Sequence, residues 1–394
     1  MKKIGVFIGG SIPSYFAHSF NVMKMADAFA GLGYEVEVVT ASSLKIDRWK
    51  KKIKDLYSHY GVRQRMCVRW LFPSLLAYVT GRTSGDKTFC RRAAHYAREN
   101  RFDMAYCRNF LIPYYTTKFG ISTFIETHTT YYDQAALEKV YEVASLPAFK
   151  GLITIHENIK QEHARRGVPV DKILVLEDGI DIERFKLHDN RHVWRKELRL
   201  DPDKHYAVYC GNLYPEKGIE VILQSAKQLL NRKDLIFLLV GGTEKDKRFW
   251  KNYCDKQRID NVQFVGFVEN AIVPKYLKAA DCLLLPYKSD MKFSIMDVKT
   301  TSPLKSFEYM ATKRPIIATG IPTISKILEH RKNALLVADG DIDEFCERIL
   351  ESLDNHYLSQ KLGERAYEDV QKYSWNRRCR IILERVQHNS CHLK

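Results

Sequence analysis

Short runs of apolar residues recur along the chain and alternate with segments of helical periodicity. In the first half the runs cover residues 4–8, 35–40, 104–107, 122–127, 152–155 and 173–178. In the second half they cover 206–211, 236–242, 262–267, 282–287, 315–320 and 334–337. Near-continuous apolar strands that alternate with helices are typical of parallel sheets buried on both faces. The pattern predicts an α/β protein with two doubly wound domains of similar design.

The segments between the runs have the apolar spacing of amphipathic helices. Residues 18–31 place Phe20, Met23, Ala26 and Ala30 on one helical face, and residues 217–230 show the same period. The polar segment 184–204 ends in a turn signal and predicts the domain break. We therefore expect domains at 1–187 and 188–374.

Charge is the feature of the composition that changes this picture. The 394 residues carry a formal net charge of +16, which predicts an acidic partner such as a phosphate ligand, an anionic membrane or nucleic acid. The nine cysteines are scattered without a CxxC pair, which favours a reducing cytoplasm over a disulfide framework or a zinc site. No signal peptide or membrane-spanning run is expected.

Parallel α/β sheets bind ligands beyond the carboxyl ends of their strands, so motifs that follow strands are informative. Gly9 and Gly10 follow the first predicted strand in "VFIGGSIPS". Glycines permit close approach of a ligand, but the GxGxxG fingerprint of dinucleotide sites is absent. A tight turn between strand and loop is the alternative interpretation.

Lys217 lies in "YCGNLYPEKGIEVIL", between a predicted strand and a predicted helix. A lysine at a helix start is unfavourable for the helix dipole. It fits better beside a diphosphate bound at the free amides of that helix end. A solvated surface lysine is the alternative.

The stretch "TTSPLKSFEYMATKRPIIAT" predicts a helix with Ser302 as N-cap and Pro303 in the first turn. The amides of Leu304 and Lys305 would then be open to an anion. Glu308 lies one turn further on the same face, where a carboxylate can accept hydrogen bonds from a ribose diol. A capped helix with an exposed glutamate is the alternative.

His128 directly follows the strand predicted at 122–127, in "FIETHTTYYD". A polar group there could contact a sugar or its leaving phosphate. A turn histidine packed on Tyr131 or Tyr132 is the alternative. The loose DxD pairs of the chain are ordinary turn or cap chemistry, and we expect no bound metal.

The segment 45–69 carries nine Lys/Arg against two acids, and Trp49, Ile53 and Leu56 repeat in it at helical spacing. The apolar "WLFPSLLAYV" (70–79) follows. A basic amphipathic stretch beside an apolar one predicts an anionic membrane contact through 45–79, and a solvated charged helix is the alternative. No nucleic-acid-binding pattern is present, so we expect no nucleic acid partner.

Taken together, these residues resemble the retaining glycosyltransferases of family 4, which have the GT-B fold. The resemblance rests on "LEDGIDIERF" (176–185), "GNLYPEKG" (211–218), "VQFVGFV" (262–268), "AADCLLLPY" (279–287), "SPLKSFEYMATKRPIIAT" (302–319) and "YSWNRRCRIIL" (373–383). It implies two Rossmann-like domains that face each other across a cleft. The N-terminal domain would bind the acceptor and the C-terminal one the nucleotide-sugar donor, with 375–394 crossing back as a helix.

The resemblance also implies roles for single residues. Lys217 would bind the diphosphate, Glu308 the ribose, and the amides near Pro303 and Leu304 the distal phosphate. Val268 would lie near the base, His128 by the transferred sugar and Gly10 near the phosphates. The family needs no metal. Since no carboxylate in the sequence can be identified as the nucleophile, we expect front-face transfer without a protein nucleophile.

Two departures from the family pattern stand out. The usual arginine of the donor loop is Asn212, and the first glutamate of E-x7-E is Thr300. Lys305 or Lys299 could supply the missing positive charge. We expect transfer from a UDP- or GDP-type donor to a glycan or lipid-linked acceptor, by a cytoplasmic protein held at the inner membrane face. A nucleotide-sugar epimerase and a non-catalytic membrane-binding scaffold are the alternatives.

Overall fold

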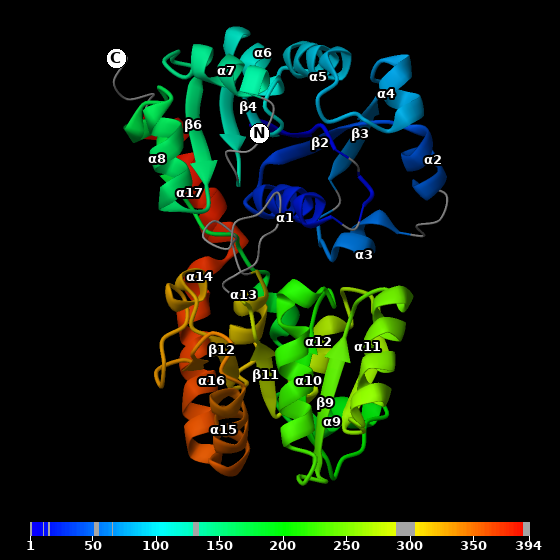
Figure 1. The fold of residues 1–394 in the computed structure, drawn as a ribbon. Helices are drawn as coiled ribbons and strands as arrows, with labels where there is room; N and C mark the ends of the chain where they lie inside the picture. The colour runs from blue at the N-terminus through cyan, green and yellow to red at the C-terminus, as the bar shows by residue number, and fades with distance from the viewer. Residues whose placement is uncertain are drawn as a thin grey trace. The chain divides into compact units, whose positions relative to one another are not determined.

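The structure is a computed structural model, and it describes residues 2–10, 12–14, 16–50, 55–64, 66–128, 134–288 and 304–388. The chain divides into unit 1 (Met1–Asp178 with Trp375–Lys394) and unit 2 (Gly179–Ser374). It leaves unit 1 after Asp178, before the polar segment 184–204, and returns at Trp375 with the C-terminal helix, drawn red in Figure 1. The acceptor and donor roles of the two domains stay predictions.

Within the described ranges, unit 1 contains a seven-stranded sheet in the order β3-β2-β1-β4-β5-β6-β7. All of its strand pairs are parallel. The strands are β1 (Lys3–Ile8), β2 (Glu35–Ala41), β3 (Cys67–Leu71), β4 (Met104–Arg108), β5 (Ser122–Glu126), β6 (Phe149–Thr154) and β7 (Ile173–Val175).

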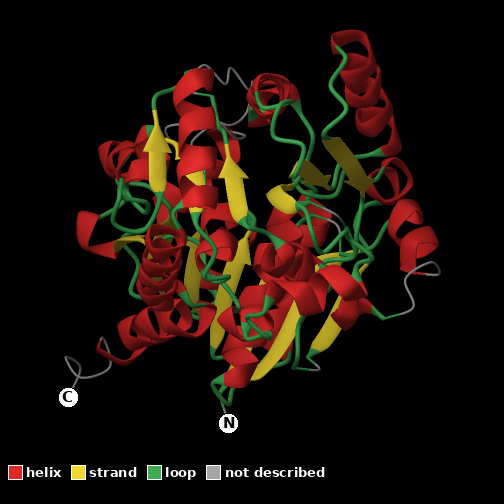
Figure 2. Ribbon diagram, turned by 90° about the horizontal axis from the view of Figure 1, so that it is seen from below, coloured by secondary structure: helices red, strands yellow, loops and turns green. Residues whose placement is uncertain are grey.

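Helices cover both faces of this sheet (Figure 2). One face packs on α1 (Ala17–Gly31), α3 (Leu56–Tyr60) and α17 (Trp375–His388). The other packs on α5 (Lys87–Glu99), α6 (Ile112–Lys118), α7 (Gln134–Val143) and α8 (Glu157–Arg165). The short helices α2 (Leu44–Lys50) and α4 (Leu75–Thr80) lie beside the edge strand β3 (Figure 1).

Unit 2 contains, in its described part, a six-stranded sheet in the order β10-β9-β8-β11-β12-β13, again parallel throughout. The strands are β8 (His205–Cys210), β9 (Leu235–Val240), β10 (Val262–Gly266), β11 (Cys282–Leu285), β12 (Ile316–Thr319) and β13 (Leu335–Val337).

Alternate residues of β8 point to opposite faces of this sheet, as the strand period of two requires. Tyr206 and Val208 join the core under α12 (Val273–Ala279), α13 (Leu304–Met310) and α16 (His356–Val370). Ala207 and Tyr209 join the core under α10 (Ile219–Gln228), α11 (Glu244–Gln257) and α15 (Ile342–Asp354). The remaining helices are α9 (Arg191–Glu197) and α14 (Pro322–Ser325).

Each of the twelve predicted apolar runs overlaps an observed strand, so the predicted α/β architecture is confirmed. The sequence pattern missed β3, whose residues Cys67–Leu71 are exposed or half-buried. An edge strand buries little of its surface and therefore lacks the continuous apolar run of a central strand.

The described parts of segment 45–69 form α2, α3 and β3 rather than one helix. Gly61, with φ 58°, ends α3 in the left-handed conformation. Of the three residues at helical spacing, Ile53 and the side chain of Trp49 lie outside the described residues. None of the described helices combines the length and the apolar character needed to cross a bilayer.

Candidate functional site

The centre of the unit 2 sheet is the point at which its strand order reverses. From β8 the chain continues outward to β9 and β10, and from β11 it continues the other way to β12 and β13. Sheets of this kind bind ligands at the carboxyl ends of the strands beside such a reversal. The residues that follow β8 and β11 are therefore the first candidates for a site.

The loop after β8 lies directly against the loop after β11. Gly218 has φ 76°, and a Cβ atom built on it would lie 1.5 Å from the carbonyl oxygen of Pro286. Only glycine fits this backbone conformation and this close approach. The contact places the short helix Pro215–Lys217 next to Tyr287.

Two lysines converge on this point from different elements. Lys217 Nζ lies 4.9 Å from the ring centroid of Tyr287, and Lys305 Nζ lies 5.9 Å from the same centroid. Lys305 also donates a hydrogen bond of 2.6 Å to the hydroxyl of Tyr209, at 4.3 Å from that ring. Neither lysine forms an ion pair with any residue that the structure describes.

The electrostatics of the pair follow from this geometry. Burial, together with the charge of Lys217, lowers the pKa of Lys305 to about 7. Burial also lowers the pKa of Lys217. Desolvation and a like-charged neighbour both disfavour the ammonium form. An anion at this edge would favour the ammonium form of both lysines.

Glu308, on the same helix as Lys305, lies close to the end of β8. Burial raises the pKa of the Cys210 thiol to about 12, and Glu308 contributes to that shift. The charge of Glu308 also favours the protonated form of Lys305. The structure therefore brings Lys217, Lys305 and Glu308 to one edge of the sheet.

For the other residues predicted to bind the donor, the structure gives only their positions in the fold. The carbonyl oxygen of Asn212 accepts a 2.8 Å hydrogen bond from Tyr209. Leu304 begins α13, and Val268 follows the edge strand β10, partly buried against the core. Four residues named in the sequence analysis lie outside the described residues: Lys299, Thr300, Ser302 and Pro303. The roles of all these residues stay predictions.

In unit 1, the glycines after β1 lie beside the loops around β2 and β4. A Cβ on Gly9 would lie 2.4 Å from Asn109 Nδ2, which favours the tight-turn interpretation for that residue. The carbonyl oxygen of Gly10 accepts a 2.8 Å hydrogen bond from Thr40. A ligand role for Gly10 stays a prediction.

His128 belongs to a buried polar cluster at the carboxyl ends of β5 and β7. Its Nε2 lies 2.6 Å from Glu126 Oε1 and 3.8 Å from Asp178 Oδ1. Asn21 Nδ2 donates to Asp178 Oδ1 at 2.7 Å. A carboxylate on one ring nitrogen fixes the orientation of an imidazole. The alternative partners Tyr131 and Tyr132 lie outside the described residues.

Glu126 in turn is held by arginines from two elements. Arg378 of α17 donates to Oε2 at 2.7 Å, and Arg108 Nη1 lies 3.4 Å from Oε1. Burial alone would raise the pKa of Glu126, but Arg378 and His128 hold it at about 2. The carboxylate therefore stays charged at every pH at which the protein would act.

Glu126, His128 and Asp178 have ligand atoms within 4.8 Å of one another, the one such metal-like group among the described residues. Two observations weigh against a divalent cation there. Both carboxylate oxygens of Glu126 already have partners, and two guanidinium groups lie beside them. Two positive charges beside Glu126 would repel a further cation at this point.

Several residues at these two edges were not singled out from the sequence. They are Tyr209, Tyr287, Glu126 and Arg378. Tyr287 closes the run "CLLLPY" and Glu126 precedes His128 by two positions, so position after a strand could have indicated both. Nothing in the local sequence distinguishes Arg378 from its neighbouring arginines.

The comparisons with known proteins agree with this architecture. The family model described as glycosyl transferases group 1 matches residues 190–369, and the model described as glycosyltransferase family 4 matches residues 21–184. An uncharacterized glycosyltransferase of Methanocaldococcus jannaschii is 22% identical over 57% of this chain and 56% of its own length. The processive diacylglycerol alpha-glucosyltransferase of Acholeplasma laidlawii is 23% identical over 60% of this chain and 71% of its own.

Among solved structures, Anabaena HepE in complex with UDP-glucose matches with a TM-score of 0.70 at 14% identity, covering 98% of this chain and 100% of that one. The matched segments span about half the length of the first curated relatives, at 56%, 47% and 49%. The two family models together account for most of the chain. The chain has the GT-B fold and belongs to glycosyltransferase family 4.

Proposed function

We propose that this protein is a retaining glycosyltransferase that transfers a sugar from a UDP- or GDP-type nucleotide-sugar to a glycan or lipid-linked acceptor. The observation that carries the proposal is the pair Lys217 and Lys305 at the carboxyl ends of β8 and β11, without an ion pair to a described residue. Two fixed cations at a strand-order reversal fit the diphosphate of a nucleotide-sugar. The structural neighbour HepE was solved in complex with UDP-glucose.

The proposed chemistry follows from the charge that develops during transfer. As the bond from the sugar to the diphosphate breaks, negative charge accumulates on the leaving phosphate. Preorganised cations in a partly buried site stabilise that charge without reorganisation of solvent. The two lysines thus supply the positive charge for which other transferases use a metal ion, and we propose that no metal is required. Glu308 is proposed to accept hydrogen bonds from the ribose.

His128 is proposed to contact the transferred sugar. Its Nε2 is held by Glu126 at 2.6 Å, so the ring has a fixed orientation before any substrate binds. Preorganisation of this kind is what a residue that positions a reacting sugar needs. Unit 1 would then bind the acceptor and unit 2 the donor.

The membrane part of the proposal rests on one surface of unit 1. We call it the α2–α4 surface, and it consists of the neighbouring elements α2, β3 and α4. Its apolar residues are exposed: Leu75 by 71%, Leu76 by 75% and Val79 by 56%. Tyr78 of α4 donates a 2.8 Å hydrogen bond to Asp47 of α2, so the basic residues of α2 lie next to this apolar group. Exposed leucines flanked by lysines and arginines are typical of contact with an anionic lipid surface.

The name of the Acholeplasma laidlawii relative, which acts on diacylglycerol, supports a lipid acceptor for the protein. Peripheral binding at the membrane would bring such an acceptor to unit 1. A glycan carried on a lipid would reach the site in the same way, and both acceptors belong to the proposal.

The test is a transfer assay with purified full-length protein, anionic vesicles and a panel of nucleotide-sugars that begins with UDP-glucose. Expected are thermal stabilisation by one donor, since a ligand of the folded state stabilises by mass action, and loss of this stabilisation in Lys217→Met. Product formation is followed by mass spectrometry, with and without EDTA. The anomeric configuration of the product, read by NMR, tests retention.

The alternatives give different results in the same assay. Formation of an epimeric nucleotide-sugar without any acceptor would favour the isomerase. Vesicle binding without stabilisation by any nucleotide-sugar would favour a non-catalytic scaffold. Either result would overturn the proposed transfer.

A further inference from the structure

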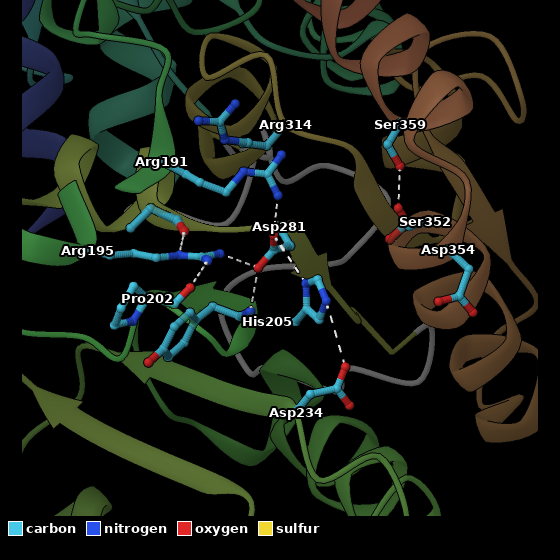
Figure 3. Close-up of polar contacts among 12 residues, drawn as sticks. Arg191, Arg195, Pro202, His205, Asp234, Asp281, Arg314, Ser352, Asp354 and Ser359 are labelled. Carbon is cyan, nitrogen blue, oxygen red and sulfur yellow. Dashed lines mark hydrogen bonds and ion pairs between the residues drawn. The ribbon is translucent and has the colours of Figure 1, made fainter. Parts of the chain in front are cut away.

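The amino-terminal edge of the unit 2 sheet, opposite the proposed donor site, holds a cavity. Its volume is about 370 Å³. His205 at the start of β8, Asp281 just before β11 and Arg314 just before β12 form its floor. Lys313 forms part of its walls, as does His356, the first residue of α16. Figure 3 shows His205, Asp281 and Arg314 from this group together with Arg191 and Arg195.

Three acids line the cavity, Asp189, Asp281 and the exposed Glu364 of α16, and the first two are already neutralised. Asp281 forms ion pairs with Arg191 and Arg195 and accepts a 2.6 Å hydrogen bond from the amide of Tyr206 (Figure 3). Asp189 pairs with Lys278 and, at 3.2 Å, with Lys313. Four cations thus share two carboxylates before Arg314 is considered.

Arg314 adds a further positive charge, which the carboxylates of Asp189 and Asp281 favour without forming an ion pair with it. Arg314 is only 7% exposed. Its guanidinium donates hydrogen bonds to the carbonyl oxygens of Lys278, at 2.8 Å, and Asp189, at 2.5 Å. It forms no ion pair with a residue of the described ranges. Neutral carbonyls satisfy hydrogen bonds but leave the charge uncompensated. Burial and the charge of Arg191 lower the pKa of Arg314 to about 10.

We propose that this cavity is a binding site for a phosphate group, free or carried by a small phosphate ester. Arg314, Lys313 and His356 are its charged and polar contacts. A guanidinium presents donors in the planar arrangement that suits phosphate oxygens. The cavity volume lies within the range of small-molecule pockets. Bound phosphate balances the excess charge of the cluster, which is the physical reason to expect it.

The site is separate from the proposed donor site. The six residues of β8 span about 20 Å between the amino and carboxyl edges of the sheet. A phosphate at the amino edge therefore does not compete with a nucleotide-sugar diphosphate at the carboxyl edge. The two are independent sites on unit 2, and the proposal holds whether or not the transferase proposal does.

The test is calorimetric titration of full-length protein with inorganic phosphate and with glycerol 3-phosphate, at constant ionic strength against chloride. Expected is saturable binding that persists in Lys217→Met, which removes a donor-site cation, and in Lys332→Gln, an exposed lysine paired with Glu329. The double variant Lys313→Gln with His356→Gln should bind at least tenfold more weakly. The relative affinities of the two titrants distinguish free phosphate from a phosphate ester.

Thermal unfolding is recorded for every variant, so that a loss of binding can be distinguished from a folding defect. No saturable binding by wild-type protein would overturn the proposal. Binding that disappears in Lys217→Met but survives in the double variant would overturn it as well, because the phosphate would then occupy the donor site.

Discussion

In the proposed donor site, Lys305 would supply the second cation for a diphosphate, because position 212 carries asparagine instead of the arginine expected from the family pattern. Its ammonium reaches the end of β8 through Tyr209 at 2.6 Å, directly above the backbone of Gly211. A Cβ atom on Gly211 would lie 2.1 Å from Lys305 Nζ. Glycine at 211 and lysine at 305 thus fit one another, and we propose that Lys305 of α13 supplies the charge missing from the loop.

The first prediction concerns this charge. Lys305→Gln should weaken UDP-glucose binding about tenfold or more, since a hydrogen bond to a charged group contributes about 1.5–3 kcal/mol. Lys305→Arg should lose less, because it keeps the charge. Isothermal titration calorimetry measures both. Lys275→Gln, which removes an exposed lysine paired with Glu197, is the matched control. Equal affinities of Lys305→Gln and wild type would contradict the role.

The second prediction is the pH dependence of donor binding. With a pKa of about 7 in the free protein, Lys305 is largely neutral at pH 9. A bound diphosphate favours the ammonium, so binding takes up a proton and the affinity for UDP-glucose should fall between pH 7 and pH 9. The fall approaches tenfold per pH unit at most. Titrations at several pH values should show it in wild type and not in Lys305→Gln; a flat wild-type profile would refute it.

The same shift has a consequence for folding. Because the pKa of Lys305 is lower in the folded chain than in the unfolded one, the folded state binds fewer protons between pH 7 and about 10.5. This residue therefore makes the protein more stable as pH rises through that window.

At the scale of elements, the loop from β8 to α10 depends on Gly218. We predict that Gly218→Ala destabilises this loop by about 1–3 kcal/mol, since alanine must adopt a strained φ of 76° and meet the carbonyl of Pro286. UDP-glucose binding should fall with it, because Lys217 is the preceding residue. Calorimetric titration and thermal unfolding check the two effects. Gly340→Ala, also at φ 76° but in open space, is the control that carries strain without the clash.

The α2–α4 surface gives the fourth prediction. Leu75→Ser with Leu76→Ser should reduce binding to anionic vesicles at least tenfold, because two exposed leucines would otherwise enter the lipid. Vesicle sedimentation measures this. The fold should be retained, since Ser74 and Asp86 anchor the start of α4 through hydrogen bonds of 2.6 and 3.0 Å.

Val170→Ser with Leu146→Ser removes exposed apolar residues elsewhere in unit 1 and should leave vesicle binding unchanged. If both double variants bind like wild type, the surface has another role.

The elements also show what sequence patterns can predict. Central strands such as β8 and β11 are buried on both faces, so their apolar runs were visible in the sequence. Strand β3 exposes its side chains and gave no such run. The positions of Lys217 and Glu308 followed from their places after a strand and on a helix. The contact of Lys305 with Tyr209 could not be predicted, because it joins residues 96 positions apart.

At the scale of the whole molecule, the return of the chain to unit 1 includes a buried ion pair beside the apolar packing of α17. Arg378 of α17 and Glu126 of β5 are 252 positions apart and meet at 2.7 Å. Both side chains are almost fully buried, at 3% and 0% exposure. Arg378 also donates to the carbonyl oxygens of Glu177, at 3.0 Å, and Leu176, at 3.2 Å. The helix is thereby tied to the polar cluster that orients His128.

The last prediction tests this link. Arg378→Met should lower the free energy of unfolding by about 3–5 kcal/mol, because it leaves the carboxylate of Glu126 buried with too little compensation. Arg380→Met, an exposed arginine on the same helix, should change it little. Since the pKa of Glu126 is lowered to about 2, the stability that it contributes is present above pH 4.5 and is lost as pH falls from there toward 2.

Urea denaturation at pH 7 and pH 3 measures both effects. The double variant Arg378→Met with Glu126→Gln should recover part of the loss, since an amide is far less costly to bury than an unpaired carboxylate. A loss below about 1 kcal/mol in Arg378→Met would show that the pair is not what holds α17 to unit 1. Binding of UDP, which lacks the sugar proposed to contact His128 and whose proposed contacts lie on unit 2, should be the same in the folded variant as in wild type, and this separates the stability of the molecule from the proposed chemistry of its site.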